Sequence, residues 1–119
     1  MAGIVHVPWY ATGLRHDVLA QELAEIAAVS LRYGASAYDL YRYRDDRYKF
    51  LQTAHFEDKV SWERYWDGPE FIEFRVRCSG WYQVPVVYGW TDLVATGAIT
   101  AEPARVPVVG RGGNGDLAG

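Results

Sequence analysis

Three aromatic side chains near the middle of the chain have the spacing of one helical face. Trp62, Tyr65 and Trp66 stand at positions i, i+3 and i+4, which are neighbours on an α-helix. Such a row can form a wall that stacks a flat substrate, and Trp66 could help that substrate to transfer an electron to dioxygen. The simpler alternative is that the row only covers a sheet, as helical aromatic rows more often do.

Three histidines, His6, His16 and His55, are the side chains that ordinarily titrate closest to neutral pH. His6 and His55 fall in strand-like segments, where either could be a general base toward a phenol or hydroxyquinone. The alternative for each is a hydrogen-bonded or partly exposed side chain outside any site. His16 falls in the polar start of a helix, where we expect it to be solvated. No two of them have the spacing of a metal-binding pair, so no metal site is predicted.

Arg75 lies on the same predicted helical stripe as Phe71 and Cys78, an unusual place for a permanent cation. A buried guanidinium without a partner is strongly destabilising, so Arg75 should meet an anion. A carboxylate of the chain, Asp39 or Glu63, is the simpler candidate, and a substrate enolate or carboxylate is the alternative. Cys78 itself is expected to be a small core residue.

The predicted site follows from these side chains. The predicted catalytic residues are His6, Trp66 and Arg75, and the predicted substrate-binding residues are Trp62, Tyr65, Phe71, His55 and Trp90. The sequence contains no Ser-His-Asp spacing signal and no phosphate-binding loop. Neither a metal nor a cofactor is predicted.

The composition limits the class of protein. The chain has 119 residues, of which 50% are hydrophobic and 23% charged, with five Trp, nine Tyr and four Phe. These values exclude a wholly disordered chain and fit one domain. No apolar run approaches the roughly 18–20 residues of a membrane span, and the N-terminus lacks the features of a secretory signal. The single cysteine excludes an internal disulfide. We therefore expect a soluble cytoplasmic protein without a membrane partner.

A cluster of cations interleaved with tyrosines occupies the predicted hairpin and consists of Arg42, Arg44, Arg47 and Lys49. Basic residues mixed with aromatics can bind RNA. However, Asp39, Asp45 and Asp46 dilute the cluster, and the formal net charge of the chain is −3. We therefore expect a solvated or dimer-facing hairpin and no nucleic-acid partner.

The helices and strands that must position these residues can be predicted from hydrophobic periodicity and from residues typical of element boundaries. Strands are expected at 3–11, 36–44, 48–57 and 84–94, and helices at 14–33, 59–67 and 69–79. The expected helix boundaries include Gly34 as a C-terminal cap, Asp58 as an N-cap and Pro69 in a first turn. Residues 1–97 then form the domain, and 98–119 an extended arm and a flexible glycine-rich tail.

This order predicts an α+β fold, a ferredoxin-like split βαβ unit with a four-stranded antiparallel sheet and both helices on one face. Such a unit leaves the second face of its sheet bare. Because tyrosines and tryptophans fall on both faces, we expect a homodimer that packs sheet against sheet in an αβ-barrel.

One local stretch carries a family resemblance. In YKFLQTAHFEDKVSWERYWDGPEF, residues 48–71, Phe56-Glu57-Asp58 ends a strand and Gly68-Pro69-Glu70-Phe71 separates two helical pieces. With this element order, the chain resembles the antibiotic-biosynthesis-monooxygenase domain of the dimeric α+β-barrel superfamily over about residues 3–96. The resemblance implies a dimer with a pocket in each subunit between sheet and helices. That family includes cofactor-independent monooxygenases of aromatic polyketides, quinol oxygenases and haem-degrading enzymes.

The chain departs from the haem-degrading members, which use an Asn on the first strand, a Trp, and a His on the second helix. Here the first strand offers His6, no Asn precedes Asn114, and the stretch 59–79 contains no His. Glu70 stands where many members of the family have a His, although Trp66 could occupy a place like the family's Trp. The resemblance therefore argues against haem degradation.

The sequence supports three functional hypotheses. The first is a homodimer that binds a hydrophobic aromatic small molecule, as a cofactor-independent monooxygenase acting on a phenol, quinol or polyketide-like ring. The second is a non-catalytic ligand-binding or protein-interaction dimer of the same fold, with 98–119 as a docking arm. The third is a cyclase or isomerase that transfers protons without oxygen.

Overall fold

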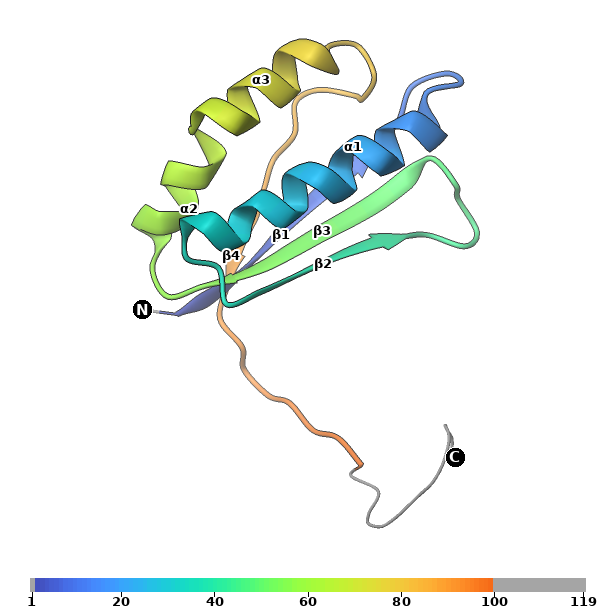
Figure 1. The fold of residues 1–119 in the computed structure, drawn as a ribbon. Helices are drawn as coiled ribbons and strands as arrows, with labels where there is room; N and C mark the ends of the chain where they lie inside the picture. Colours follow the sequence, from blue (N-terminus) through green and yellow to red (C-terminus); the bar gives the residue numbers. More distant parts are fainter. Residues whose placement is uncertain (1, 100–119) are drawn as a thin grey trace.

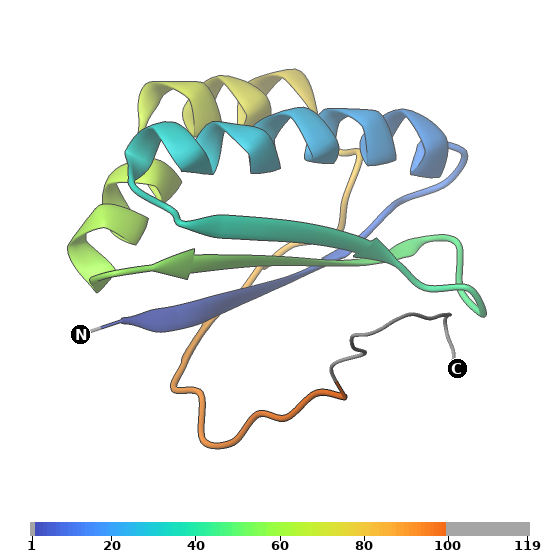
Figure 2. The same ribbon diagram turned by 60° about the horizontal axis from the view of Figure 1, so that its bottom comes forward.

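The computed structural model describes residues 2–99 and shows a four-stranded antiparallel sheet with helices on a single face (Figures 1 and 2). Its elements are β1 (Gly3–Tyr10), α1 (His16–Val29), the 3₁₀ helix η1 (Ser30–Tyr33), β2 (Ala37–Arg42), β3 (Lys49–Phe56), α2 (Lys59–Trp66), α3 (Pro69–Arg77) and β4 (Gly89–Thr91). The strand order is β2-β3-β1-β4. The predicted α+β, ferredoxin-like fold is therefore confirmed.

Local signals form most of these elements as predicted. The helical stripe predicted for α1 and η1 is buried and consists of Leu19, Leu23, Ile26, Ala27 and Ser30. Gly34 ends this helical segment with a φ of +104°, a conformation that glycine adopts without strain. The Asp58 side chain caps α2 by accepting a hydrogen bond of 2.8 Å from the backbone N–H of Ser61. Pro69 occupies the first turn of α3.

The last predicted strand, 84–94, is wrong in extent, because only Gly89–Thr91 pairs as β4. Before it, Tyr82 forms an isolated bridge with Ala11, and the chain then runs irregularly to residue 88. Pro85 has no N–H to donate to a strand neighbour, and the valines before and after it do not alternate into a core. The segment 82–88 therefore packs beside the helices through individual side chains.

The core lies between the helices and the inner face of the sheet. Val5, Val7 and Trp9 of β1 are buried there, and β3 contributes Gln52 on the same face. Gln52 is 1% exposed, accepts a hydrogen bond from Trp9 Nε1 and donates one to the Tyr65 hydroxyl, both at 3.0 Å. The Tyr65 hydroxyl in turn donates to the Ile26 carbonyl at 2.6 Å. One buried amide thus links β1 and β3 to α2 and α1.

The outer face of the sheet, directed away from the helices, carries both apolar and polar side chains. Across β1, β3 and β2, the rows of paired residues are Ile4, His55 and Ala37, then His6, Thr53 and Asp39, then Pro8, Leu51 and Tyr41. Figures 1 and 2 show the chain after β4 running away on this side of the sheet. The predicted arm and tail at 98–119 lie outside the described residues, apart from 98 and 99.

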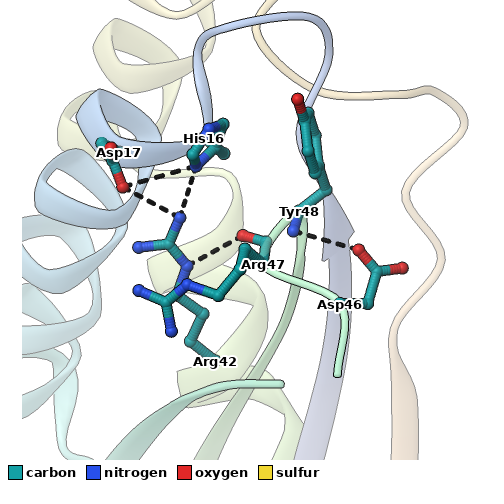
Figure 3. Close-up of polar contacts among 6 residues, drawn as sticks. All are labelled: His16, Asp17, Arg42, Asp46, Arg47 and Tyr48. Atoms are coloured by element: carbon teal, nitrogen blue, oxygen red, sulfur yellow. Dashed lines mark hydrogen bonds and ion pairs between the residues drawn. The ribbon is translucent and has the colours of Figure 1, made fainter. Parts of the chain in front are cut away.

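A polar cluster fixes the loop end of the β2–β3 hairpin to the start of α1 (Figure 3). Arg42 points inward, donates to His16 Nδ1 at 2.6 Å and forms an ion pair of 3.0 Å with Asp17. Its Nε also donates to the Arg47 carbonyl of the hairpin at 2.8 Å. His16, which we expected to be solvated, is partly buried because the Arg42 guanidinium and the Tyr48 ring lie against it. This cluster is a structural clamp.

Candidate functional site

A hollow of about 310 Å³ lies between β1, the end of α2, α3 and the irregular segment after α3. Its lining residues are Trp9, Trp66, Asp67, Arg75, Tyr82, Val84 and Val86. This volume is near the lower end of the range of about 300–1,000 Å³ typical of small-molecule sites. We call it the aromatic hollow. It combines aromatic walls with a cation and a carboxylate.

Arg75 supplies the cation of the aromatic hollow, and neutral groups hold it there. Its Nη2 donates to the carbonyl of Trp66 at 2.8 Å, at the end of α2, where a helix dipole favours positive charge. Its guanidinium also lies 4.5 Å from the ring centre of Trp66 and 4.6 Å from that of Phe71. Within residues 2–99, Arg75 makes no ion pair.

The carboxylates expected beside Arg75 are therefore not its partners. Asp39 lies on the outer face of the sheet, in register with Thr53. Glu63 is exposed on α2 and makes no ion pair with Arg75. The α2–α3 turn instead presents a backbone carbonyl to the guanidinium, and no carboxylate of residues 2–99 forms an ion pair with it. This arrangement can stabilise an anion that enters the hollow.

Trp66 is the member of the predicted aromatic row that reaches the hollow. Trp62 and Tyr65 are 0% and 1% exposed and pack behind it as core. The Trp62 and Trp66 rings stack with centroids 5.2 Å apart, and Phe71 lies 4.6 Å from Trp66. Two rings of the row are therefore core, as the simpler alternative expected, and the third lies at the wall of the hollow.

Two tyrosines near the hollow remain protonated at neutral pH. Burial raises the pKa of Tyr82, which lines the hollow, above its usual value. Burial raises the pKa of Tyr65 more strongly, although its hydrogen bond with Gln52 and the charge of Arg75 oppose the shift. A protonated phenol donates hydrogen bonds and does not take up a proton, so Tyr82 is a donor toward any ligand in the hollow.

The structure does not bring His6, His55 or Trp90 to the aromatic hollow. His6 and His55 lie on the outer face, because their neighbours Val5, Val7, Ala54 and Phe56 point inward. His55 lines a different hollow of about 230 Å³ near the start of β1, with Ile4, Glu57 and Leu93 among its other lining residues. Trp90 packs over Gly3, where a Cβ would lie 2.7 Å from its ring. The predicted roles of these three residues stay predictions.

Five lining residues were not among the predicted site residues: Trp9, Asp67, Tyr82, Val84 and Val86. Trp9 had a usable signal, since it alternates with Val5 and Val7 on the inward face of the first strand. Asp67 directly follows Trp66 at a helix end. The three later residues had none, because Val84 and Val86 fall in the predicted strand 84–94 and Tyr82 falls between that strand and the predicted helix. Among residues 2–99 there is also no group of three or more His, Cys, Asp or Glu that could hold a metal ion.

Comparison with known proteins identifies the fold. The sequence matches no protein-family model and no curated protein sequence. Among solved structures, PA3566 from Pseudomonas aeruginosa superposes with a TM-score of 0.70 at 22% identity, over 79% of this chain and 95% of that one. SnoaB, a cofactor-independent oxygenase from Streptomyces nogalater, gives a TM-score of 0.69 at 18% identity, over 80% and 95%. An antibiotic biosynthesis monooxygenase gives 0.68 at 14% identity, over 80% and 100%.

These superpositions confirm that the chain shares the fold of an antibiotic biosynthesis monooxygenase and of a cofactor-independent oxygenase, the fold that the family resemblance implied. They span nearly the whole length of the compared proteins. Within the described residues, no helix has the length and hydrophobicity needed to cross a bilayer.

Proposed function

We propose that the aromatic hollow binds a flat aromatic molecule that is or becomes an anion, and that the protein is a cofactor-independent monooxygenase of an electron-rich phenol, quinol or anthrone-like ring. The single observation that carries this proposal is Arg75, a cation with no ion-pair partner in residues 2–99 that lies against two aromatic rings. The fold shared with SnoaB, a cofactor-independent oxygenase, supports it.

The proposed reaction follows from the residues that line the hollow. The substrate ring stacks on Trp66 and loses a proton, and Arg75 stabilises the oxyanion that results. The electron-rich anion then donates an electron to dioxygen in a partly water-excluded site. For an anthrone, a ring methylene becomes a ketone, one oxygen atom of dioxygen enters the ring and the other leaves as water. Trp66 and Arg75 are the proposed catalytic residues, and Phe71 supports them from behind.

A homodimer forms part of the proposal. Pro8, Leu51 and Tyr41 form a row across the outer face, and Figure 2 shows no helix on that side of the sheet. A second copy packed on this face would bury these side chains and leave the aromatic hollow, on the helix side, open.

The alternative is a non-catalytic ligand-binding or interaction dimer, and one observation favours it. Trp62, Tyr65 and Phe71, all predicted to bind substrate, are fully packed in the core. The free volume is therefore small, and the aromatic residues also explain the stability of the fold without a substrate.

Oxygen uptake separates these two functions. The wild-type protein should consume dioxygen with at least one member of a panel of anthrones, quinols and polycyclic phenols. Arg75→Met and Trp66→Phe should each lower kcat/KM by at least about tenfold, because charge stabilisation and ring stacking are lost. Arg64→Met is the matched control, since Arg64 is exposed on α2 and does not line the hollow. Ligand binding without oxygen uptake would favour the non-catalytic alternative.

A further inference from the structure

The lining of the aromatic hollow includes one carboxylate, that of Asp67. The titratable lining residues are Asp67, Arg75 and Tyr82. Arginine stays protonated in proteins, and burial raises the pKa of Tyr82, so that its phenol also keeps its proton. The histidines that could act as bases lie elsewhere: His6 and His55 are on the outer face, and His16 is at the start of α1.

Asp67 has its carboxylate free for this task. The side chain makes no hydrogen bond and no ion pair with any residue in the range 2–99. Its backbone N–H, by contrast, donates to the Glu63 carbonyl at 2.9 Å and so fixes the residue at the end of α2. Asp67 is exposed, and because nothing among residues 2–99 bonds to its side chain, both carboxylate oxygens retain their acceptor sites.

The arrangement around Asp67 separates two charges at the wall of the hollow. Asp67 directly follows Trp66, whose carbonyl holds the Arg75 guanidinium and whose ring lies beneath it. The wall therefore offers a carboxylate to take a proton and a cation to stabilise the electron pair left behind. An aspartate can act as general base on a carbon acid when a second group stabilises the enolate oxygen.

We propose that Asp67 is the general base of the aromatic hollow, and that it removes a proton from a ring carbon adjacent to a conjugated carbonyl system. In this step the substrate C–H bond breaks, its electron pair delocalises onto the carbonyl oxygen as an enolate, and the proton forms an O–H bond with the Asp67 carboxylate. Arg75 faces the enolate. The step consumes no oxidant. The proposal for Asp67 rests on the proposed function in one respect, the class of molecule that binds in the hollow.

Hydrogen–deuterium exchange isolates this step from oxygenation. The probe is 1,8-dihydroxyanthrone in D₂O under nitrogen. The rate at which its methylene protons are lost is followed by ¹H NMR, and its binding is followed by quenching of tryptophan fluorescence. The wild-type protein should accelerate exchange, whereas Asp67→Asn should lose about 100-fold or more of the acceleration with its Kd within about twofold of wild type. Asp67→Glu, which retains a carboxylate, should recover part of the rate.

The matched control is Glu63→Gln, which removes an exposed carboxylate one turn earlier on the same helix, outside the hollow. It should exchange the probe at the wild-type rate. If Asp67→Asn binds and exchanges the anthrone as fast as wild type does, or if bound wild type gives no acceleration, Asp67 is not the base and the binding proposal stands. If wild type does not bind the anthrone, the proposed function fails and the role of Asp67 falls with it. Circular dichroism and the urea midpoint verify that each variant is folded.

Discussion

At the scale of single residues, two polar side chains that lie among aromatic rings differ in how their polar groups are paired. Gln52 is fully buried and has both ends of its amide paired, with Trp9 and with Tyr65. Arg75 is partly buried and has neutral partners: it donates a hydrogen bond to the Trp66 carbonyl, and its guanidinium lies against two aromatic rings. The satisfied amide makes the core specific, while the guanidinium, which has no ion pair among residues 2–99, is the basis of the proposed anion site.

We expect Gln52→Met to destabilise the protein by about 1–3 kcal/mol, with little change in core volume. The substitution removes both amide hydrogen bonds and leaves the buried Trp9 N–H without its acceptor, which costs about that much. Urea denaturation followed by fluorescence gives the free energy of unfolding. Gln21→Met, on the exposed side of α1, is the control and should change it by no more than about 0.5 kcal/mol. An unchanged free energy in Gln52→Met would mean that the buried amide contributes nothing net.

At the scale of elements, the break between α2 and α3 determines the shape of the hollow. Gly68 allows this break because no Cβ fits there: it would lie 2.6 Å from the Arg64 carbonyl oxygen and 2.8 Å from the Tyr33 hydroxyl. The same Tyr33 hydroxyl donates to the Glu70 carboxylate at the start of α3. The hydrogen bond lowers the pKa of Glu70 and raises that of Tyr33. Tyr33, at the end of η1, therefore holds the first turn of α3 in place through its hydrogen bond with Glu70.

Gly68→Ala should therefore destabilise the fold by about 1–3 kcal/mol, the usual cost of overpacking, and weaken ligand binding in the hollow. The obstructing atom is a backbone carbonyl oxygen, which cannot move away as a side chain can. Gly89→Ala is the matched control, since a Cβ there meets nothing within 4 Å. Urea denaturation of both variants, together with anthrone titration, tests this. Equal stability of the two variants would contradict the steric explanation.

The clamp between α1 and the hairpin predicts a dependence of stability on pH. The hydrogen bond from Arg42 lowers the pKa of Asp17, and the charges of His16 and Arg42 add to the effect. Because the folded pKa lies below the unfolded one, the ionised carboxylate stabilises the fold above the ordinary carboxyl range. This contribution is lost as the pH falls below about 4 toward the folded value.

The urea midpoint of wild type should therefore fall more steeply between pH 5 and 3, about the ordinary carboxyl range, than that of Asp17→Asn. Asp45→Asn is the control, because Asp45 is an exposed hairpin carboxylate without a hydrogen bond or ion pair among residues 2–99. It should retain the wild-type slope. Parallel pH profiles for wild type and Asp17→Asn would show that the clamp adds no stability through this carboxylate.

At the scale of the whole molecule, the two faces of the sheet have different surroundings. The inner face is covered by α1, α2 and α3, and the outer face has no helix on it (Figures 1 and 2). The described chain also carries exposed apolar side chains after β4, with Leu93 at 64% and Val94 at 94% exposure. In the proposed homodimer, a second copy of the chain would cover the apolar row of this face and the segment beside it.

Light scattering coupled to gel filtration should therefore show a dimer for the wild-type protein at micromolar concentration. Leu51→Asp should be monomeric, because Leu51 lies on β3 between Pro8 of β1 and Tyr41 of β2 on the outer face, and each subunit would bury an unpaired carboxylate there. Val76→Asp places the same charge on an exposed position of α3 and should remain dimeric. A monomeric wild type, or a dimeric Leu51→Asp, would remove the sheet-to-sheet dimer from the proposal.

The sequence by itself determined what depends on a few neighbouring residues. The buried stripe of α1, the Gly34 end of its helical segment, the Asp58 cap and the Pro69 start were all predicted, because periodicity and capping act within one or two turns. The order of the elements then predicted the four-stranded antiparallel sheet and the ferredoxin-like α+β fold. The sequence also assigned Trp66 and Arg75 to one predicted site, and both line the aromatic hollow.

Only the tertiary structure decided what depends on segments far apart in the chain. The partner of Arg75 is a backbone carbonyl, which no side-chain pattern reveals, and the hollow needs Trp9 from β1 as well as Tyr82 from the segment after α3. The pleat of β1 and β3 placed His6 and His55 on the opposite face from the hollow, although His6 lies on the same strand as Trp9. Aromatic side chains can fill a core or line a cavity equally well, and long-range packing alone chose between the two for Trp62 and Trp66.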